Sequence, residues 1–272
     1  FLETMVKNQT VISYFFVLCY SNLDHMIIDK NNSRHLLINT DTPFIWHKEN
    51  LINIAVNKLL PNNWTAFAWI DSDIEFDNPF WAFQAMEMLN RTNDVVQLFS
   101  KVLSYEKNGS YTSDPSFVYQ NIVTKEKKKL SRTGLAWAIS KAGYLRIGRI
   151  LDFMITGGGD TVFALSIFNS SEIFNIFPRE FSDDFKNSIL LYKEKASKLK
   201  AGYVPGIIRH FFHGRRQKRL YYERQKILIR NKFEPKKHLR IVENELIVPS
   251  KSCPRKLLLQ IQQYFKNRNE DE

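Results

Sequence analysis

The chain has 272 residues, of which 44% are hydrophobic and 14% are aromatic. This apolar content supplies a sizeable core, which excludes a disordered tail and a disulfide-stapled miniprotein and leaves one large domain or two small ones. The 39 Lys and Arg residues exceed the 28 Asp and Glu residues, so the net charge of +11 predicts an anionic partner such as nucleic acid, a phosphorylated substrate or an acidic membrane surface.

Three further features concern the setting of the protein. Cys19 and Cys253 are too few and too far apart for a disulfide framework or a thiolate metal site. The apolar run at residues 11–20 is shorter than the roughly 20 residues that span a bilayer, so no transmembrane segment is expected. Because Phe1 stands where an initiator Met is expected and no signal-peptide pattern follows it, we expect a fragment or a processed product.

The first part of the chain alternates strand and helix patterns. Runs rich in β-branched and aromatic residues predict strands at residues 11–18, 35–39, 66–70 and 95–99. Apolar residues that recur three and four positions apart predict an amphipathic helix at residues 48–60, which Pro61 ends. Pro79 opens a second helix that runs to about residue 90.

The second part begins with a polar segment at residues 100–129, which predicts a surface excursion or hairpin. Beyond it we expect a strand at 134–139, helices at 141–147, about 160–168 and 182–200, a strand at 203–212, another helix, a loop from Pro235 to Pro249 and a closing helix at 255–266. This alternation predicts an α/β fold with a mostly parallel sheet and helices on both faces. We expect one domain at residues 1–232, with a helical C-terminal extension at residues 233–272 packed on it.

A pair of carboxylates, Asp71 and Asp73, directly follows the predicted strand at 66–70. Ligands in open α/β sheets bind outside the carboxyl ends of the strands. Mg²⁺ and Mn²⁺ take oxygen ligands and often share them with phosphates, so the motif suggests a metal–diphosphate site. The structural alternative, which is the more frequent one for an isolated pair, is a solvated acidic turn.

A second motif, Gly157-Gly158-Gly159-Asp160, opens a predicted helix. Glycines let the backbone approach a ligand closely. Asp160 is then either the helix cap, the more frequent role, or a general base that deprotonates a hydroxyl from the bottom of a cleft.

A third motif combines two histidines, His210 and His213, with the cations Arg215, Arg216, Lys218 and Arg219. A neutral imidazole binds a metal ion, and the cations bind phosphate oxygens. The same stretch, with Tyr221 and Tyr222 nearby, also fits a basic patch that contacts nucleic acid.

The order of these motifs resembles that of the GT-A glycosyltransferases, most of all the galactosyltransferase group, which carries a D-x-D motif and a motif of the G-G-E-D type. The resemblance rests on AFAWI followed by Asp71-Ser-Asp73, on GLAWAISK at residues 134–141, on GGGD and on IIRHFFHG. Residues 46–53 and 264–271 are similar to uncharacterised bacterial and viral members. The resemblance covers the chain from about residue 45 to the C-terminus.

The resemblance implies a GT-A catalytic domain at residues 1–232 that moves a hexose from a nucleotide-diphosphate donor, UDP-linked, to a hydroxyl acceptor with inversion. Asp73 would bind Mn²⁺, or Mg²⁺, directly, and Asp71 would share the metal or face the donor ribose. One of His210 and His213 would complete the coordination. The Met/His pair of the family falls on Ile207 and His210, whereas the His-Gly pattern of other GT-A enzymes favours His213, so both stay open.

The same resemblance assigns the remaining roles. Asp160 matches the general base of the inverting branch, and Gly158 and Gly159 would shape the acceptor site. Trp137 either offers a ring face to a sugar or fills the core. The charge that builds on the diphosphate leaving group would be neutralised by Arg215, Arg216, Lys218 and Arg219.

The sequence departs from the family in three places. Residues 154–156 are Met, Ile and Thr where the animal galactosyltransferases carry tryptophan, so the acceptor identity does not transfer. Gly159 stands where the motif has Glu, which removes one acceptor contact. The GT-A fold begins with a strand and loop that hold the nucleotide base, and we expect part of that pocket to precede Phe1.

Two other functions fit some of the same features. A nucleic-acid-binding protein without catalysis would use the net charge and the cationic run at 125–129, and a metal-dependent nucleotidyltransferase would use the paired carboxylates. For the transferase, the expected partners are a nucleotide-sugar donor and a glycan or other hydroxyl acceptor, with no specific nucleic acid. The compartment stays open between the cytoplasm, which is slightly favoured, and the Golgi lumen.

Overall fold

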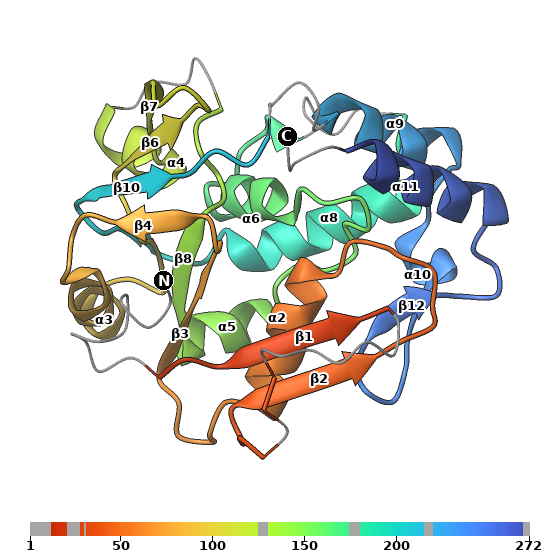
Figure 1. Cartoon of the computed structure of the whole chain (residues 1–272), viewed down its shortest axis with the longest axis horizontal. Coiled ribbons are helices and arrows are strands. Elements are labelled where there is room, and N and C mark those ends of the chain that lie inside the picture. Colours follow the sequence, from red (N-terminus) through yellow and green to blue (C-terminus); the bar gives the residue numbers. More distant parts are fainter. Residues whose placement is uncertain are drawn as a thin grey trace.

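The computed structural model describes residues 12–20, 28–29, 31–124, 130–173, 180–214 and 220–268. They form a mixed α/β fold in which the strands make several small sheets and the helices pack around them (Figure 1). Within these residues, no helix is both long and apolar enough to cross a membrane.

The central sheet has the strand order β3-β8-β5-β9. Its strands are β3 (Ala66–Ile70), β8 (Ala136–Ser140), β5 (Val95–Gln97) and β9 (Ala201–Tyr203). Strand β8 runs antiparallel to both β3 and β5, whereas β9 is parallel to β5. Trp137 and Ile139 face one hydrophobic cluster and Ala136 and Ala138 face another, so this sheet is buried on both faces.

Helices cover the two faces of the central sheet (Figure 1). On one face lies α3 (Trp81–Arg91), which buries Trp81, Ala85 and Leu89. On the other lie α5 (Lys141–Ile147), α6 (Gly159–Ile167) and α8 (Asp183–Ala196). Ser140 and Ser182 cap α5 and α8 by accepting hydrogen bonds from backbone N–H groups of the first turn, which fixes where these helices begin.

A second sheet of order β4-β10-β6-β7 lies beside the first. Its strands are β4 (Ile74–Phe76), β10 (Ile207–His210), β6 (Lys101–Tyr105) and β7 (Tyr111–Pro115). Strand β10 is antiparallel to β4 and parallel to β6, and β6 and β7 form a hairpin. The hairpin predicted within residues 100–129 is therefore confirmed for its described part, and residues 125–129 lie outside the described residues.

Two small strand pairs enclose the helix α2 (Lys48–Lys58). The pairs are β1 (Phe15–Cys19) with β2 (His35–Asn39), which is parallel, and β11 (Leu239–Ile241) with β12 (Ile247–Pro249), which is antiparallel. Ile54 of α2 shares one hydrophobic cluster with Ile38 and Val248, so α2 packs against both pairs, and Figure 1 shows it directly behind β1 and β2.

The other helices are α4 (Phe117–Tyr119), the π-helix η1 (Gln120–Thr124), α9 (Tyr221–Arg230), α10 (Pro235–His238) and α11 (Arg255–Asn267). Phe233, Leu257 and Ile261 belong to the same hydrophobic cluster as α6 and α8. The described part of the C-terminal extension thus contributes to the main core.

Three details of the predicted fold are wrong. The sheets are mixed rather than mostly parallel, because periodicity predicts that a segment is a strand and not the direction in which it pairs. The strand predicted at 203–212 is two strands in different sheets, since Pro205 lacks an N–H and Gly206 has a φ of 150°. The loop predicted between Pro235 and Pro249 contains α10 and the β11–β12 hairpin.

Candidate metal site and carboxylate cavity

Asp73, His210 and His213 come together at the end of β10. Asp73 lies in the turn between β3 and β4, and β4 pairs with β10 so that Ile74 is opposite His210. The Phe211 N–H donates to the Asp73 carbonyl at 2.9 Å, which fixes the chain after β10 against this turn. Strand pairing therefore brings the second acid of the D-x-D motif to both histidines.

The ligand atoms of the three side chains converge on one point. Asp73 Oδ2 is 3.2 Å from His210 Nε2 and 2.8 Å from His213 Nε2, and the two Nε2 atoms are 3.2 Å apart. Burial favours the neutral acid, but hydrogen bonds from both histidines outweigh it and hold the pKa of Asp73 well below its ordinary value. One carboxylate and two imidazoles form a donor set that suits a divalent transition-metal ion, so this trio is a candidate metal site.

The other Asp73 oxygen supports this interpretation. Asp73 Oδ1 is buried and has no hydrogen-bond partner among the described residues. A buried carboxylate oxygen without a partner is costly, and a bound cation would satisfy it.

Asp71, the first acid of the motif, has a different partner. Its carboxylate forms an ion pair with Lys48, at the start of α2, and is not part of the trio. Burial favours the neutral amine, but the surrounding carboxylates, led by Asp71, outweigh it and hold the pKa of Lys48 above its ordinary value. The structure thus gives the two acids of the D-x-D motif different neighbours.

The first turn of α2 is fixed by buried hydrogen bonds to β12. His47 Nε2 donates to the Ile247 carbonyl at 2.7 Å, and Asn50 Oδ1 accepts from the Ile247 N–H at 2.9 Å. The next turn is held by Asn53, which donates to the Ile150 carbonyl at 2.8 Å. These contacts place Lys48 and the residue after it, Glu49, beside the N-terminus of α6.

A narrow cavity lies at this junction of α2, α6 and β8. Its volume of about 10 Å³ admits no more than one water-sized group. The lining residues are Lys48, Glu49, Ile52, Trp69, Gly134, Leu135, Trp137, Ile150, Gly159, Asp160 and Phe163. Glu49 is only 6% exposed, and burial, partly offset by Lys48 and reinforced by Asp160, raises its pKa to about 7.

Glycines make room for the charged side chains around this cavity. A Cβ on Gly134 would collide with Asp160 Oδ2, and a Cβ on Gly159 would lie 2.6 Å from Glu49 Oε1. A Cβ on Gly158 would lie 2.9 Å from an Arg224 nitrogen, and Gly158 also has a φ of 99°, which favours glycine.

The structure places the predicted acceptor residues as follows. Gly158 is the N-cap of α6, so Asp160 lies in the first turn of the helix rather than at the cap. Asp160 Oδ1 accepts from the Thr161 N–H at 2.8 Å, and Asp160 lines the cavity. Trp137 is 1% exposed and donates its indole N–H to the Thr133 carbonyl, so it fills the core beneath the cavity.

The four cations expected to bind the diphosphate, Arg215, Arg216, Lys218 and Arg219, lie outside the described residues. Of the C-terminal stretch 264–271, the structure describes residues 264–268.

The sequence interpretation gave no role to Lys48 and Glu49. It assigned the buried face of the helix at 48–60 to apolar residues, whereas the structure buries Glu49, Asn50 and Asn53 together with Ile54 and Val56. The available signal was the set of polar residues at three- and four-residue spacing at the start of this helix, which marks a polar face that needs buried partners.

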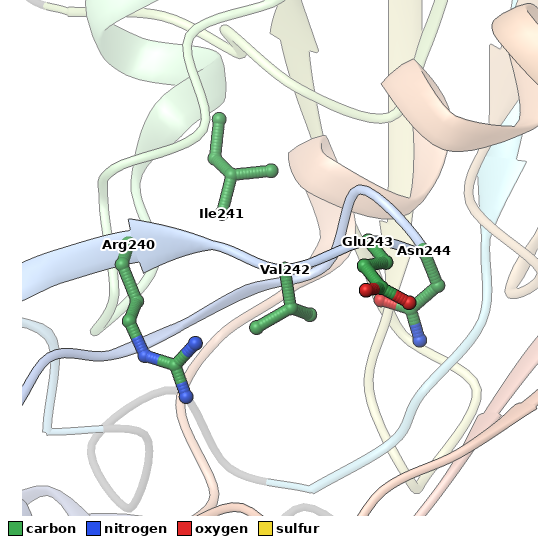
Figure 2. A pocket seen from close by; sticks show the side chains of 5 residues that line it. All are labelled: Arg240, Ile241, Val242, Glu243 and Asn244. Atoms are coloured by element: carbon green, nitrogen blue, oxygen red, sulfur yellow. The ribbon is translucent and has the colours of Figure 1, made fainter.

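A shallow hollow elsewhere on the surface is lined by Arg240, Ile241, Val242, Glu243 and Asn244 at the β11–β12 turn (Figure 2). In Figure 2 the side chains of Ile241 and Val242 point to opposite sides of the chain. Strands β4 and β10 lie on the other side of the molecule (Figure 1), so this hollow is separate from the metal site.

The chain matches no family model and no curated protein sequence.

Proposed function

We propose that the protein is a metal-dependent glycosyltransferase that moves a hexose from a UDP-linked donor to a hydroxyl acceptor. The observation that carries the proposal is the convergence of Asp73, His210 and His213 on one point. The ordered D-x-D, GGGD and IIRHFFHG motifs support the GT-A assignment. So does Asp160, which lines a cavity with Lys48, the ion-pair partner of the first motif acid.

The trio fits the cofactor that the motif implies. Imidazole nitrogens favour Mn²⁺ over Mg²⁺, which prefers oxygen ligands, and Asp73 supplies the oxygen that both ions accept. When bound, the ion stabilises the negative charge on the diphosphate leaving group. Lys48 adds a positive charge beside Asp71, and its raised pKa keeps the amine protonated.

Asp160 acts as the general base. In the proposed step the acceptor oxygen attacks the anomeric carbon of the donor, and its proton passes to the Asp160 carboxylate. The bond between that carbon and the diphosphate oxygen breaks, and the diphosphate leaves with the electron pair. Attack on the face opposite the leaving group inverts the anomeric centre.

Thermal unfolding in the presence of ligands tests the proposal. A ligand that binds only the folded state raises the melting temperature. We expect UDP with Mn²⁺ to raise it well above the value with Mn²⁺ alone. No added effect of UDP would contradict the proposal. A steeply salt-dependent affinity for generic duplex DNA without a nucleotide effect would indicate a nucleic-acid-binding protein instead.

Product analysis separates the transferase from a nucleotidyltransferase. Incubation with UDP-sugars, Mn²⁺ and hydroxyl acceptors should release UDP. Release of pyrophosphate from a nucleotide substrate would assign the site to nucleotidyl transfer.

A further inference from the structure

Two arginines and two aromatic side chains from distant parts of the chain lie against one another. Arg224 and Tyr221 both belong to α9, and the Arg224 Cζ lies 4.8 Å from the centroid of the Tyr221 ring. Arg268, at the end of α11, lies over the same ring at 5.9 Å and over the Trp46 ring at 5.3 Å. The cluster of Trp46, Tyr221, Arg224 and Arg268 is called the arginine box below.

The glycine turn before α6 closes the arginine box. A Cβ on Gly157 would lie 3.2 Å from Arg224 Nη1 on one side and, on the other, 3.7 Å from Cε2 of Trp46, the carbon bonded to the indole nitrogen. A Cβ on Gly158 would lie 2.9 Å from Arg224 Nη2. The absence of side chains at both positions therefore lets the guanidinium group lie against the backbone of the turn.

The arginine box offers positive charge and hydrogen-bond donors to a ligand. Within the described residues, no Asp or Glu forms an ion pair with Arg224, and the adjacent Glu223 pairs with Lys226 instead. The Trp46 Nε1 is buried and has no hydrogen-bond partner in the described part of the chain, which is costly for a donor. Both arginines are half-buried, so an ion can reach them from solvent. Their planar guanidinium groups match the oxygens of a phosphate or carboxylate.

We propose that the arginine box binds the phosphate or carboxylate group of an acidic acceptor. The box shares no residue with the trio of Asp73, His210 and His213, so it is separate from the metal site. It lies against the turn that begins α6, and Asp160 is in the first turn of that helix, so an acceptor held by its anionic group lies near the proposed base. That the bound molecule is the acceptor rests on the proposed function, whereas the binding of an oxyanion does not.

Binding of inorganic phosphate, without added metal ion, tests the site independently of sugar transfer. Phosphate should raise the melting temperature of the wild type above that in KCl of equal ionic strength, because it binds the folded state. R224Q should lower the affinity for phosphate by about tenfold or more, since a charged hydrogen-bonding group is lost. R230Q removes the same charge from an exposed position of the same helix and should bind phosphate as the wild type does.

Two further variants keep the site testable if R224Q does not fold. R224K keeps the positive charge but lacks the planar pair of donors, and W46F keeps an aromatic ring but lacks the indole N–H. Both should bind phosphate more weakly than the wild type. Wild-type affinity in both variants would overturn the site.

The kinetics of transfer test whether the anion belongs to the acceptor. R224Q should raise KM for a sugar phosphate or a sugar carboxylate by about tenfold, and should change KM for the corresponding neutral sugar by less than about threefold. Equal changes for acidic and neutral sugars would overturn the acceptor assignment. The affinity for UDP with Mn²⁺ should stay unchanged, and a loss of it would assign the arginine box to the donor diphosphate instead.

The outcomes distinguish this inference from the proposed function. If phosphate binds through Arg224, but the wild type neither binds UDP with Mn²⁺ nor transfers sugar, the proposed function is wrong and the arginine box remains an oxyanion site. If the wild type transfers sugar, but phosphate does not stabilise it or stabilises R224Q equally, the arginine box is overturned and the proposed function stands.

Discussion

The metal site and the carboxylate cavity are built in different ways. The metal site lies at the ends of short strands, where Asp73 is 27% exposed, His213 is 30% exposed and His210 is buried. The cavity lies between helices, where Glu49 is 6% exposed and Trp137 1%. The pairing of β4 with β10 positions the metal site. The cavity is positioned by buried polar contacts of α2, and the absence of a side chain at Gly134 and Gly159 leaves room for its acids.

Because the two sites are built differently, substitutions in them should have different effects on binding, chemistry and stability. Two of the three side chains at the metal site, Asp73 and His213, are partly exposed, so substitutions of these two should affect binding more than folding. The cavity depends on a buried acid and on close packing, so substitutions there should change chemistry and stability together.

The largest expected effect is that of Asp73→Ala on the metal site. Removing the only carboxylate of the trio should lower metal-dependent transfer by about a hundredfold to a thousandfold, because the charge on the leaving group loses its stabilisation. Titration of UDP in the presence of Mn²⁺ should show the matching loss of binding. Glu75→Gln, at an exposed ion pair with Arg209, serves as the control and should keep activity. Full activity of Asp73→Ala would remove the metal site from the mechanism.

The second effect is the change in unfolding free energy with pH that the buried acid Glu49 causes. The pKa of Glu49 is about 7 in the folded chain against an ordinary value of 4.5. Between pH 4.5 and pH 7 the Glu49 carboxyl is ionised in the unfolded chain but still protonated in the folded chain. The free energy of unfolding therefore falls as the pH rises through this range, and it falls no further once the pH is well above 7. Between pH 5 and pH 8 the wild type should lose about 2–3 kcal/mol relative to E49Q in urea unfolding. Parallel pH profiles of the two proteins would show that Glu49 titrates normally.

Gly134→Ala should affect the cavity and leave the metal site intact. The added methyl group would collide with Asp160 Oδ2 and displace this carboxylate from its place. A small displacement of a catalytic group is expected to lower kcat by about tenfold to a hundredfold. The affinity for UDP with Mn²⁺, measured by calorimetry, should be unchanged, and an unchanged kcat would argue against Asp160 as the base.

The smallest effect is expected from Asn50→Ala, which removes a hydrogen bond that holds α2 against β12. The variant leaves the buried Ile247 N–H without its acceptor and should cost about 1–2 kcal/mol of unfolding free energy. Asn50 bonds to Asp152, Glu245 and Ile247 and is not part of the metal trio, so Mn²⁺ affinity should not change. A loss of metal affinity would mean that the two sites are coupled through α2.

Local patterns predicted most of the elements around the sites. The strands at 35–39 and 66–70 and the helix at 141–147 are confirmed with the same bounds, because each is a short segment with an unambiguous pattern and a clear boundary. Sheet direction was not predictable in this way, since antiparallel and parallel strands share the same period. The polar face of α2 was missed because its partners, such as Ile247, are distant in the sequence.

The sequence by itself determined the candidate ligands and acids, because D-x-D, GGGD and the two histidines are local motifs with recognisable chemistry. It left open which of the two histidines would meet the metal. Only the tertiary structure decided that both histidines contact Asp73, that Asp71 pairs with Lys48 and that Glu49 lies against Gly159. These contacts join segments that are distant in the chain, and their geometry follows from strand register and helix packing.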